Sequence, residues 1–520
     1  MERQTLIYDF KGLVRTVASK VSKYKIYNAV GRDKNTVDRW LEGAYPQDPV
    51  DIGKIIDLAL HNQIKIHPFQ SFDPIYDFSS EISYEEKLAA GPPELGWLRE
   101  LYPTLPRYRT EVCGLKLDCP IGIGASPLTG DEHWSIAMLE LGYGLSSFKT
   151  RRTGPKEPWV KPQIGFVIQA PSLMDSESLP EVLVTMRKGD IHKRIPDLVN
   201  SIGVPSESVA EWQASFARIQ SHPLGHQMGI SVIGDADAPK GLLADFLDAV
   251  SYAAELEPTF IELNLSCPNL KGRDFYSDLD LLRNLCRGAK QRLKGNTLLF
   301  AKLAYVPRQQ LEAIVKIIGE VVDAIVFRNT LKVRPVQRDR DGDRHGPFPG
   351  RDTAGLSGPS TFPLTLKGIQ ILDQQRRAMG LTFAIIAAGG VADVDNAKKL
   401  LEDGASAVQA VTAPMFDPLL AWKMRYSNRS TSQEIIQPTT LVAQSSSGLI
   451  PPRLDAEYTA LHNATQAFRE ARKQKPDLAH SVFVNRWNLF MEKSPQNLPG
   501  QAQKTNRNKL VPDWIKDFLS

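Results

Sequence analysis

The chain has few cysteines and no long apolar run. Its 520 residues include four cysteines, none of them in a CxxC pair, so neither a disulfide framework nor a zinc or thioredoxin-like motif is expected. No run of about 18 apolar residues is present, and the first residues lack the apolar core and cleavage site of a secretory signal. These absences predict a cytoplasmic protein without a membrane span or a bound metal.

A large excess of one charge is also missing. The 63 Lys and Arg residues and 59 Asp and Glu residues leave a formal net charge of +4. This balance argues against a polybasic coat for nucleic acid, although a local basic patch remains open. With 42% hydrophobic and 23% charged residues, the composition is that of a globular protein, and the length predicts about two to four domains.

Residues 1–70 have the pattern of short helices. Apolar positions recur on both sides of Gly31, Asn35 is a candidate N-cap of the second helix, and Gly43 can end it. The pattern is similar to a helix-turn-helix, in which the second helix enters the major groove of DNA. Residues 1–45 contain nine Lys and Arg residues compared with five Asp and Glu residues. The segment either binds DNA or packs as a small bundle on the main domain or on a partner.

Residues 106–425 alternate short β-favouring runs with amphipathic helical segments. Eight such strands over about 300 residues predict an α/β fold, a (β/α)8 TIM barrel, with a doubly wound open sheet as the alternative. The expected strands span 120–126, 143–150, 227–234, 260–266, 298–304, 324–330, 384–391 and 407–413. The connection after the second strand is too long for one helix, so an insertion is expected over 151–199, above the mouth of the barrel.

Two further segments flank the barrel. Residues 71–105 are rich in proline and aromatic residues and are expected to connect the helical segment to the barrel by wrapping over it. Residues 426–520 are rich in polar residues and are expected to be a C-terminal extension, partly helical and partly mobile.

Polar residues occur at the carboxyl ends of the predicted strands, where barrels of this kind carry their reactive groups. Lys302 lies in an apolar strand, where a cation is costly unless it faces a carboxylate, an anion or an electron-rich cofactor. Gly389 and Gly390 follow the seventh strand, and Thr412 and Ala413 end the eighth. This is where barrels commonly bind phosphate, although a plain turn would also explain the glycines.

A second group of polar residues surrounds Cys267. Asn264 and Asn269 flank this cysteine, and Asn329 ends another strand. Amide side chains both donate and accept hydrogen bonds, so these three could together recognise a planar, lactam-like ring. The cysteine itself is either a small buried apolar side chain or a catalytic group.

The segment ELNLSCPN (262–269) resembles the active-site signature of the dihydroorotate dehydrogenases, specifically the class 1 type, in which a cysteine is the base. Other segments resemble that family in the same order along the chain: PIGIGAS (120–126), FKT (148–150), NSIGVPS (200–206), AKLAY (301–305), FRNT (327–330), AGLSGP (354–359), AAGGV (387–391) and VTA (411–413). Class 2 relatives carry serine in place of the cysteine. The resemblance covers about 320 residues and departs from the family at Pro127, in the insertion and in both terminal extensions.

The resemblance implies an FMN-dependent oxidoreductase that acts on a CH–CH bond and oxidises (S)-dihydroorotate to orotate in pyrimidine biosynthesis. Cys267 would remove the C5 proton while a hydride passes from C6 to flavin N5, and Lys149 would bridge flavin and substrate. The implied substrate-binding residues are Asn200, Gly203, Val204, Asn264, Asn269, Asn329 and Thr330. The implied FMN-binding residues are Ala125, Ser126, Lys149, Asn264, Lys302, Gly358, Gly389, Gly390, Thr412 and Ala413. Homodimers are common among class 1 relatives.

Two other functions remain open at this stage. The departures from the family allow an FMN-dependent reductase or dehydrogenase of another dihydropyrimidine-like substrate. The helix-turn-helix pattern allows a DNA-binding regulator that senses a flavin or a metabolite. The sequence does not identify the electron acceptor: fumarate, a quinone and a partner flavoprotein are all compatible with it.

Overall fold

A computed structural model describes most of the chain up to residue 427. The described residues are 10–42, 44, 49–62, 64, 74–93, 108–171, 179–191, 193, 195–266, 275–339 and 341–427. The predicted helices and mobile parts of the C-terminal extension beyond residue 427 lie outside this set, as do Gly43, Cys267 and Asn269. Among the described helices, none combines the length and the apolar character that a membrane crossing needs.

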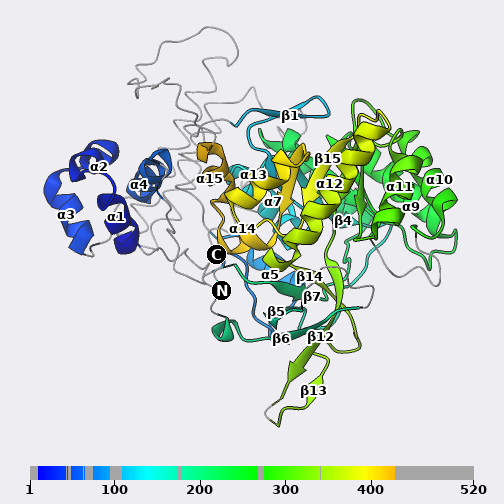
Figure 1. The fold of residues 1–520 in the computed structure, drawn as a ribbon, viewed down its shortest axis with the longest axis horizontal. Coiled ribbons are helices and arrows are strands. Elements are labelled where there is room, and N and C mark those ends of the chain that lie inside the picture. The colour runs from blue at the N-terminus through cyan, green and yellow to red at the C-terminus, as the bar shows by residue number, and fades with distance from the viewer. Residues whose placement is uncertain are drawn as a thin grey trace, which may run out of the picture. The chain divides into compact units, whose positions relative to one another are not determined.

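Eight parallel strands form the centre of the molecule (Figure 1). In sheet order they are β3 (Ile121–Ile123), β16 (Ala407–Ala410), β15 (Ala384–Ala388), β11 (Ala324–Phe327), β10 (Leu298–Leu303), β9 (Phe260–Asn264), β8 (Met228–Val232) and β4 (Ser146–Arg151). The sheet closes between its first and last strands, because the Gly144 N–H donates to the Ile121 carbonyl at 2.8 Å and the Ile123 N–H to Ser146 Oγ at 2.9 Å. The TIM barrel is confirmed, each strand lies within its predicted range or one residue beyond it, and the open sheet is wrong.

Helices surround these strands, and most of them are amphipathic. They are α7 (Glu132–Glu140), α8 (Val209–Gln220), α9 (Leu242–Ala254), α10 (Leu279–Lys290), α11 (Arg308–Ile318), α12 (Phe362–Ala378), α13 (Val394–Glu402), the short α14 (Thr412–Phe416) and α15 (Leu420–Ser427). Helix α10 shows why they form: Leu282, Leu285 and Cys286 share one buried face at helical spacing. Asp278 caps its start by accepting from the Leu281 N–H at 2.9 Å.

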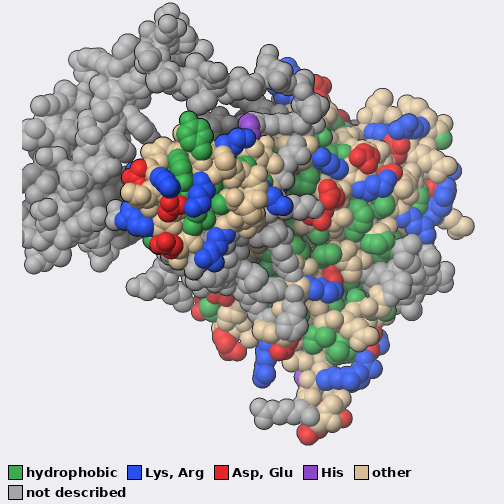
Figure 2. Space-filling model, turned by 60° about the vertical axis from the view of Figure 1, so that its left-hand side comes forward, with side chains coloured by type: hydrophobic (Ala, Val, Ile, Leu, Met, Phe, Trp, Pro, Cys, Tyr) green, Lys and Arg blue, Asp and Glu red, His purple; other side chains and the backbone are tan. Residues whose placement is uncertain are grey.

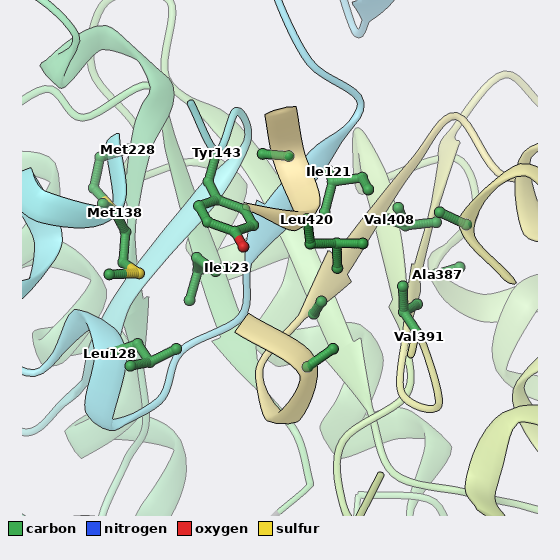
Figure 3. Close-up of a cluster of buried hydrophobic side chains, with 14 of the residues drawn as sticks. Ile121, Ile123, Leu128, Met138, Tyr143, Met228, Ala387, Val391, Val408 and Leu420 are labelled. Carbon is green, nitrogen blue, oxygen red and sulfur yellow. The ribbon is translucent and has the colours of Figure 1, made fainter. Parts of the chain in front are cut away.

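Apolar side chains fill the space between strands and helices, as Figure 3 shows where the barrel closes. Ile121 and Ile123 of β3 lie there with Val408 of β16 and Leu420 of α15, all nearly inaccessible to water. Tyr143 is also buried, and its hydroxyl donates to the Pro418 carbonyl at 3.1 Å. The start of α15 is therefore fixed beside the closure of the barrel by both apolar packing and a satisfied polar group.

A second sheet lies at the mouth of the barrel (Figure 1). It combines β5 (Ile164–Gln169), β6 (Glu181–Thr185) and β7 (Leu198–Asn200) with β12 (Leu331–Arg338), β13 (Arg344–His345) and β14 (Ala354–Ser357). Strand β12 pairs with both β14 and β6, so the sheet curls onto itself. The sequence predicted only the half of this insertion that lies within 151–199. The half after β11 was missed, because charged residues and Pro335 make LKVRPVQR resemble a loop.

The segment before the barrel contacts both the barrel and the insertion sheet. Phe78 stacks on Phe416 with ring centroids 5.2 Å apart and lies 5.3 Å from the ring of Phe166 on β5. The Ile75 N–H donates to the Met415 carbonyl at 2.8 Å. The segment also contains α5 (Tyr84–Ala90), which was not predicted, and it is followed by a hairpin of β1 (Thr110–Val112) and β2 (Leu115–Leu117). Aromatic packing on two elements explains the composition of this connector.

Where the structure describes the N-terminal segment, it contains the helices α1 (Phe10–Ala18), α2 (Lys23–Val30), α3 (Lys34–Glu42) and α4 (Pro49–His61). Helices α2 and α3 lie on the two sides of Gly31, as the apolar pattern predicts. The predicted N-cap is wrong: Asp33, and not Asn35, accepts from the Thr36 N–H at 2.7 Å. Aspartate and asparagine are both good caps, so composition alone did not decide between two residues this close together.

The closure of the barrel depends on Gly122, which gives a first prediction. A Cβ atom at this position would lie 1.9 Å from the Leu145 carbonyl oxygen, so β3 and β4 would have to separate. We expect Gly122→Ala to lower the free energy of unfolding by about 3 kcal/mol, the upper part of the range for overpacking. Thermal unfolding measures this change. Gly154→Ala is the control, because its Cβ would meet no atom within 4 Å. Equal thermal unfolding midpoints for the two variants would contradict the close contact between Gly122 and Leu145.

Candidate functional site

A cavity of about 1420 Å³ lies between the carboxyl ends of the barrel strands and the insertion sheet. Its lining includes nearly all of the predicted site residues that the structure describes: Ala125, Ser126, Lys149, Asn200, Gly203, Val204, Asn264, Lys302, Asn329, Thr330, Gly358, Gly389, Gly390 and Thr412. Ala413 is buried in α14 and does not line the cavity. Residues far apart in the sequence thus meet in one place, as the barrel topology requires.

An amide network lies at the carboxyl ends of β4, β8, β9 and β11. Asn264 Nδ2 donates to Thr150 Oγ1 at 3.1 Å, and its Oδ1 atom accepts from the Ser266 hydroxyl and from Asn329 Nδ2, the latter at 3.4 Å. Thr150 in turn lies 3.0 Å from the hydroxyl of Ser231 on β8. The predicted convergence of Asn264 and Asn329 is therefore present, and each holds the other in place.

The insertion sheet adds a second side to this network. Asn200, at the end of β7, donates from Nδ2 to the Gly355 carbonyl at 3.1 Å. Thr330 lies against the same glycine, since a Cβ on Gly355 would be 2.4 Å from Thr330 Oγ1. After β7 the Val204 carbonyl accepts from Arg152 Nε at 2.9 Å. The loop predicted to bind substrate is thereby fastened to the barrel.

Lys302 lies at the inner end of the cavity beside a buried carboxylate. Its Nζ atom is 3.7 Å from Glu262 Oε1, and Glu262 Oε2 accepts from Ser147 Oγ at 3.1 Å. Gly124 faces this group, since a Cβ there would lie 3.6 Å from Lys302 Nζ and 3.4 Å from Gln409 Oε1. The Gln409 oxygen is buried and has no hydrogen-bond partner in the described structure. Glycine at 124 therefore leaves a space that is bounded by one cation and one unused acceptor.

Lys149, on β4, is the most perturbed cation of the cavity. Its side chain is only 7% exposed and makes no hydrogen bond or ion pair with the described residues. Burial, followed by the charges of Arg151 and Lys302, lowers the pKa of Lys149 to about 7. Arg151 is itself paired with Glu207, so it fixes the end of β4 without neutralising its neighbour. An anion in the cavity would restore the charged form of Lys149.

Glycines and buried hydroxyls surround the far end of the cavity. Gly358, Gly389 and Gly390 all have positive φ angles, between 79° and 119°, which other residues rarely adopt. Asp197 Oδ1 accepts from the Ser360 N–H at 2.8 Å and so holds the loop of Gly358 against β7. Backbone turns of this kind present N–H groups to anions.

Arg328 is a candidate functional residue that the sequence analysis missed. It is 2% exposed, it lines the cavity, and it donates to the carbonyls of Asn329 at 2.7 Å and Thr361 at 3.4 Å. Its Nε atom has no partner, and no carboxylate of the described chain forms an ion pair with it. Burial lowers the pKa of Arg328 to about 10. A Cβ on Gly389 would lie 3.9 Å from Arg328 Cζ, so this cation stands beside the glycine loop.

A signal for Arg328 is nevertheless present in the sequence. The arginine directly follows the apolar strand AIVF, much as Lys302 lies inside the apolar strand LLFAKL. A charged residue in such a position is costly without a counter-charge. The same reasoning that selected Lys302 would therefore have selected Arg328.

Comparisons with known proteins agree with the resemblance seen in the sequence. Residues 188–424 match the family model described as dihydroorotate dehydrogenase. The dihydroorotate dehydrogenase of Dictyostelium discoideum is 24% identical over 376 residues, which cover 69% of this chain and 98% of that protein. The catalytic subunit of the NAD(+)-dependent dihydroorotate dehydrogenase B of Thermoplasma acidophilum is 25% identical, over 58% of this chain and 86% of that protein.

Solved structures include similar chains. A crystal structure of the dihydroorotate dehydrogenase of Eimeria tenella in complex with ferulenol has a TM-score of 0.48 and 19% sequence identity. The alignment covers 66% of this chain and 92% of that one.

The buried charge of Lys149 predicts a pH-dependent effect on stability. The pKa of this group is lower in the folded chain than the ordinary value of 10.5, so the unfolded chain binds the extra proton between about pH 7 and pH 10.5. The buried charge therefore lowers the free energy of unfolding by its full amount below pH 7. This loss disappears as the pH rises from about 7 to 10.5. Lys149→Met should therefore raise the thermal unfolding midpoint at pH 6, and should raise it less at pH 10.

A matched control is available within the same cavity. Lys332 also lines it but is exposed. Lys332→Met should change the free energy of unfolding by no more than about 0.5 kcal/mol at either pH, as is usual for surface positions. A destabilised Lys149→Met variant at pH 6 would show that the lysine has a counter-charge.

Proposed function

We propose that this chain is a member of the dihydroorotate dehydrogenase family, an oxidoreductase acting on a CH–CH bond, which binds FMN and oxidises (S)-dihydroorotate to orotate. One observation carries the proposal. A single cavity joins the amide network of Asn264 and Asn329 to two buried lysines, Lys149 and Lys302. A flat, anionic pyrimidine and an electron-rich ring both suit such a lining.

The residues present fit FMN. Bound FMN would accept at N5 the hydride that leaves C6 of the substrate. The space beside Gly124 gives access to Lys302, whose positive charge would stabilise the negative charge that builds at the N1–C2 edge of a reduced ring. Ala125 and Ser126 line the same part of the cavity, and the Ser126 hydroxyl is buried without a partner in the described structure.

The substrate would lie between the barrel and the insertion sheet. Asn200, Asn264 and Asn329 each offer an amide to the ring nitrogens and carbonyls of a pyrimidine, with Asn269 as a fourth on the basis of the resemblance. Lys149 would hold the carboxylate, supported by the loop of Gly203 and Val204 and by Thr330. The amide network orients these groups before the substrate arrives, which lowers the entropy cost of binding.

Cys267 would act as the base, a role that rests on the resemblance of ELNLSCPN to the family signature. Its thiolate would take the proton from C5 of the substrate and become a neutral thiol. Only the thiolate can accept this proton, so the rate should rise with pH toward the thiol pKa.

The homodimer suggested by the resemblance also remains a prediction.

The phosphate of FMN would lie at the glycine loops. Gly358, Gly389, Gly390 and Thr412 line this end of the cavity, and Thr412 donates to Ser357 Oγ at 3.0 Å. Arg328 would add a positive charge there, directed at the phosphate through its unpaired Nε atom. A doubly charged phosphate would supply the counter-charge that the described protein does not.

Anaerobic mixing with dihydroorotate tests the proposed reaction. The purified protein should carry FMN, and its absorbance should bleach when (S)-dihydroorotate is added. Cys267→Ala should retain FMN and lower the rate of bleaching by about 10²–10⁴-fold, the usual effect of losing a positioned general base. Cys267→Ser should retain some activity that is shifted to higher pH, because a hydroxyl is harder to deprotonate than a thiol. Stopped-flow spectroscopy between pH 6 and 10 measures these rates.

Three outcomes of this experiment would change the conclusion. A colourless protein that does not take up added FMN would refute the flavin site. A protein with FMN that another dihydropyrimidine bleaches, but dihydroorotate does not, would move the proposal to that substrate. Unchanged rates in Cys267→Ala would assign proton removal to another group.

The role of Arg328 can be tested with two flavins that differ only in phosphate. Arg328→Met should weaken FMN binding by about tenfold or more, because a charge-assisted hydrogen bond is lost. Riboflavin, which has no phosphate, should bind both proteins within about twofold. Quenching of flavin fluorescence on titration with the apoprotein measures both affinities. Arg351→Met is the control, since Arg351 lines the cavity but packs on the Trp159 ring. If Arg328→Met lowered the affinity for FMN and for riboflavin equally, the role of Arg328 would be purely structural.

A further inference from the structure

The helices α2 and α3 form a helix-turn-helix that has no part in the proposed oxidoreductase site. The turn between them is Gly31, Arg32 and Asp33, three residues long. Gly31 adopts φ 67°, and its N–H donates to the Tyr27 carbonyl at 2.8 Å, which ends α2. Asp33 then begins α3 by capping it. Both ends of the turn are fixed by local hydrogen bonds, so the angle between the two helices is defined.

One face of each helix is buried in a small apolar core. Ile26 and Val30 of α2 and Val37 and Trp40 of α3 are all nearly inaccessible to water. Helices α1 and α4 contribute further buried residues, among them Leu13, Val14, Val17, Ile55, Ile56 and Ala59. The opposite face of α3 is thus directed to solvent, and it can be considered as a binding surface.

Polar contacts hold α3 rigidly within this segment. At its C-terminal end the Leu41 carbonyl accepts from Arg15 Nε of α1 at 3.0 Å. Near its middle, Asp38 pairs with Lys23 of α2 at 2.7 Å. The turn before it is joined to α4, because Arg32 Nε lies 2.8 Å from the buried carboxylate of Asp51. A preorganised helix loses little entropy when it binds a partner.

The exposed face of α3 carries side chains that suit the edges of base pairs. Lys34, Asn35 and Arg39 are exposed, and Asn35 and Arg39 are four residues apart, so they lie on the same face of the helix. Asparagine can form two hydrogen bonds with adenine, and arginine can form two with guanine, both in the major groove. Lys34 stands in the first turn, the part of a recognition helix that reaches the bases.

The charge of the segment also favours a polyanion. Residues 10–42 contain eight Lys and Arg residues compared with three Asp and Glu residues, although the whole chain is nearly balanced. Figure 2 shows several basic side chains on the surface of this segment, with fewer acidic ones between them. Asp38 is one of the three acidic residues, and its ion pair with Lys23 offsets its repulsion of phosphate. The excess of positive charge is therefore local and adjacent to α3.

We propose that this helix-turn-helix binds duplex DNA, with α3 in the major groove. Asn35 and Arg39 contact base edges, and Lys34 contacts a phosphate or a base at the start of the helix. Lys25, exposed on α2, lies on the helix that crosses the sugar–phosphate backbone in this mode of binding. The proposal is independent of the flavin site, since no residue of that site lies in this segment.

Selection from a pool of randomised 30-base-pair duplexes with the full chain tests the proposal. The chain should enrich a sequence motif, and fluorescence anisotropy should show that its affinity falls roughly tenfold or more between 50 and 200 mM salt. Arg39→Ala and Asn35→Ala should each lower the affinity for the motif roughly tenfold and relax the preference at one base pair. Both side chains are exposed, so the helical content should remain unchanged in circular dichroism.

Lys316→Ala is the matched control, because this lysine is exposed on α11 of the barrel. It should leave the affinity and the selected motif unchanged. Absence of binding at 50 mM salt would overturn the proposal and leave the segment a packing role. The placement of α3 in the groove would be overturned by binding that enriches no motif and that Lys316→Ala weakens as much as Arg39→Ala and Asn35→Ala do.

Discussion

Positive charge buried at the mouth of the barrel is the constraint that the rest of the structure has to accommodate. Among the described residues, Lys302 has Glu262 beside it and Arg152 pairs with Asp235, but neither Lys149 nor Arg328 forms an ion pair with a carboxylate. Burying a charge without a partner costs free energy, and the large apolar core of the barrel must offset this cost. A protein that served only as a scaffold would gain by replacing both residues with apolar side chains. Their presence is therefore the strongest physical indication that the cavity receives an anion.

Binding an anion in this cavity also requires that the polar groups around the cations stay in place. Asn264 serves as a shared acceptor for Ser266 and Asn329, and Asn200 of the insertion sheet, held by the Gly355 carbonyl, lines the same cavity. The sheet is held in turn by aromatic packing, in which Phe78 lies between Phe166 of the sheet and Phe416 of the barrel. Local order at the amides thus depends on apolar contacts made by residues that are distant in the sequence.

The sequence predicted the barrel well, because most of its strands contain short apolar runs, such as AIVF in β11 and AIIAA in β15, that are buried on both faces. Such runs are typical of parallel sheets and leave little ambiguity when eight of them alternate with amphipathic helices. The insertion sheet was half missed because successive parts of β12 pair with β14 and with β6, and β6 is distant in the sequence. Its charged side chains reflect exposure on one face, and no local pattern reveals the pairing.

The polar residues at the predicted strand ends could be identified as site residues from the sequence. A single charged residue beside them, Arg328, was missed. The amides and lysines were recovered because they stand at strand ends, which the barrel topology brings together. Arg328 was not predicted because its lack of a counter-charge is visible only in three dimensions. The N-cap at Asp33 is a similar case, since the choice between two good capping residues depends on where the turn at Gly31 ends.

Buried charge also links the stability of the barrel to what it binds. An anion beside Lys149 or Arg328 removes part of the free-energy cost that the folded chain otherwise bears, and it does so only in the folded state. Ligand binding and folding are then coupled, since any ligand that prefers the folded chain shifts the unfolding equilibrium toward it. An anion near Lys149 also raises the pKa of this lysine, so binding above about pH 7 takes up a proton. The two cations that cost the ligand-free barrel free energy are therefore the ones that an anion at the mouth would stabilise most, whereas Lys302 already lies beside Glu262.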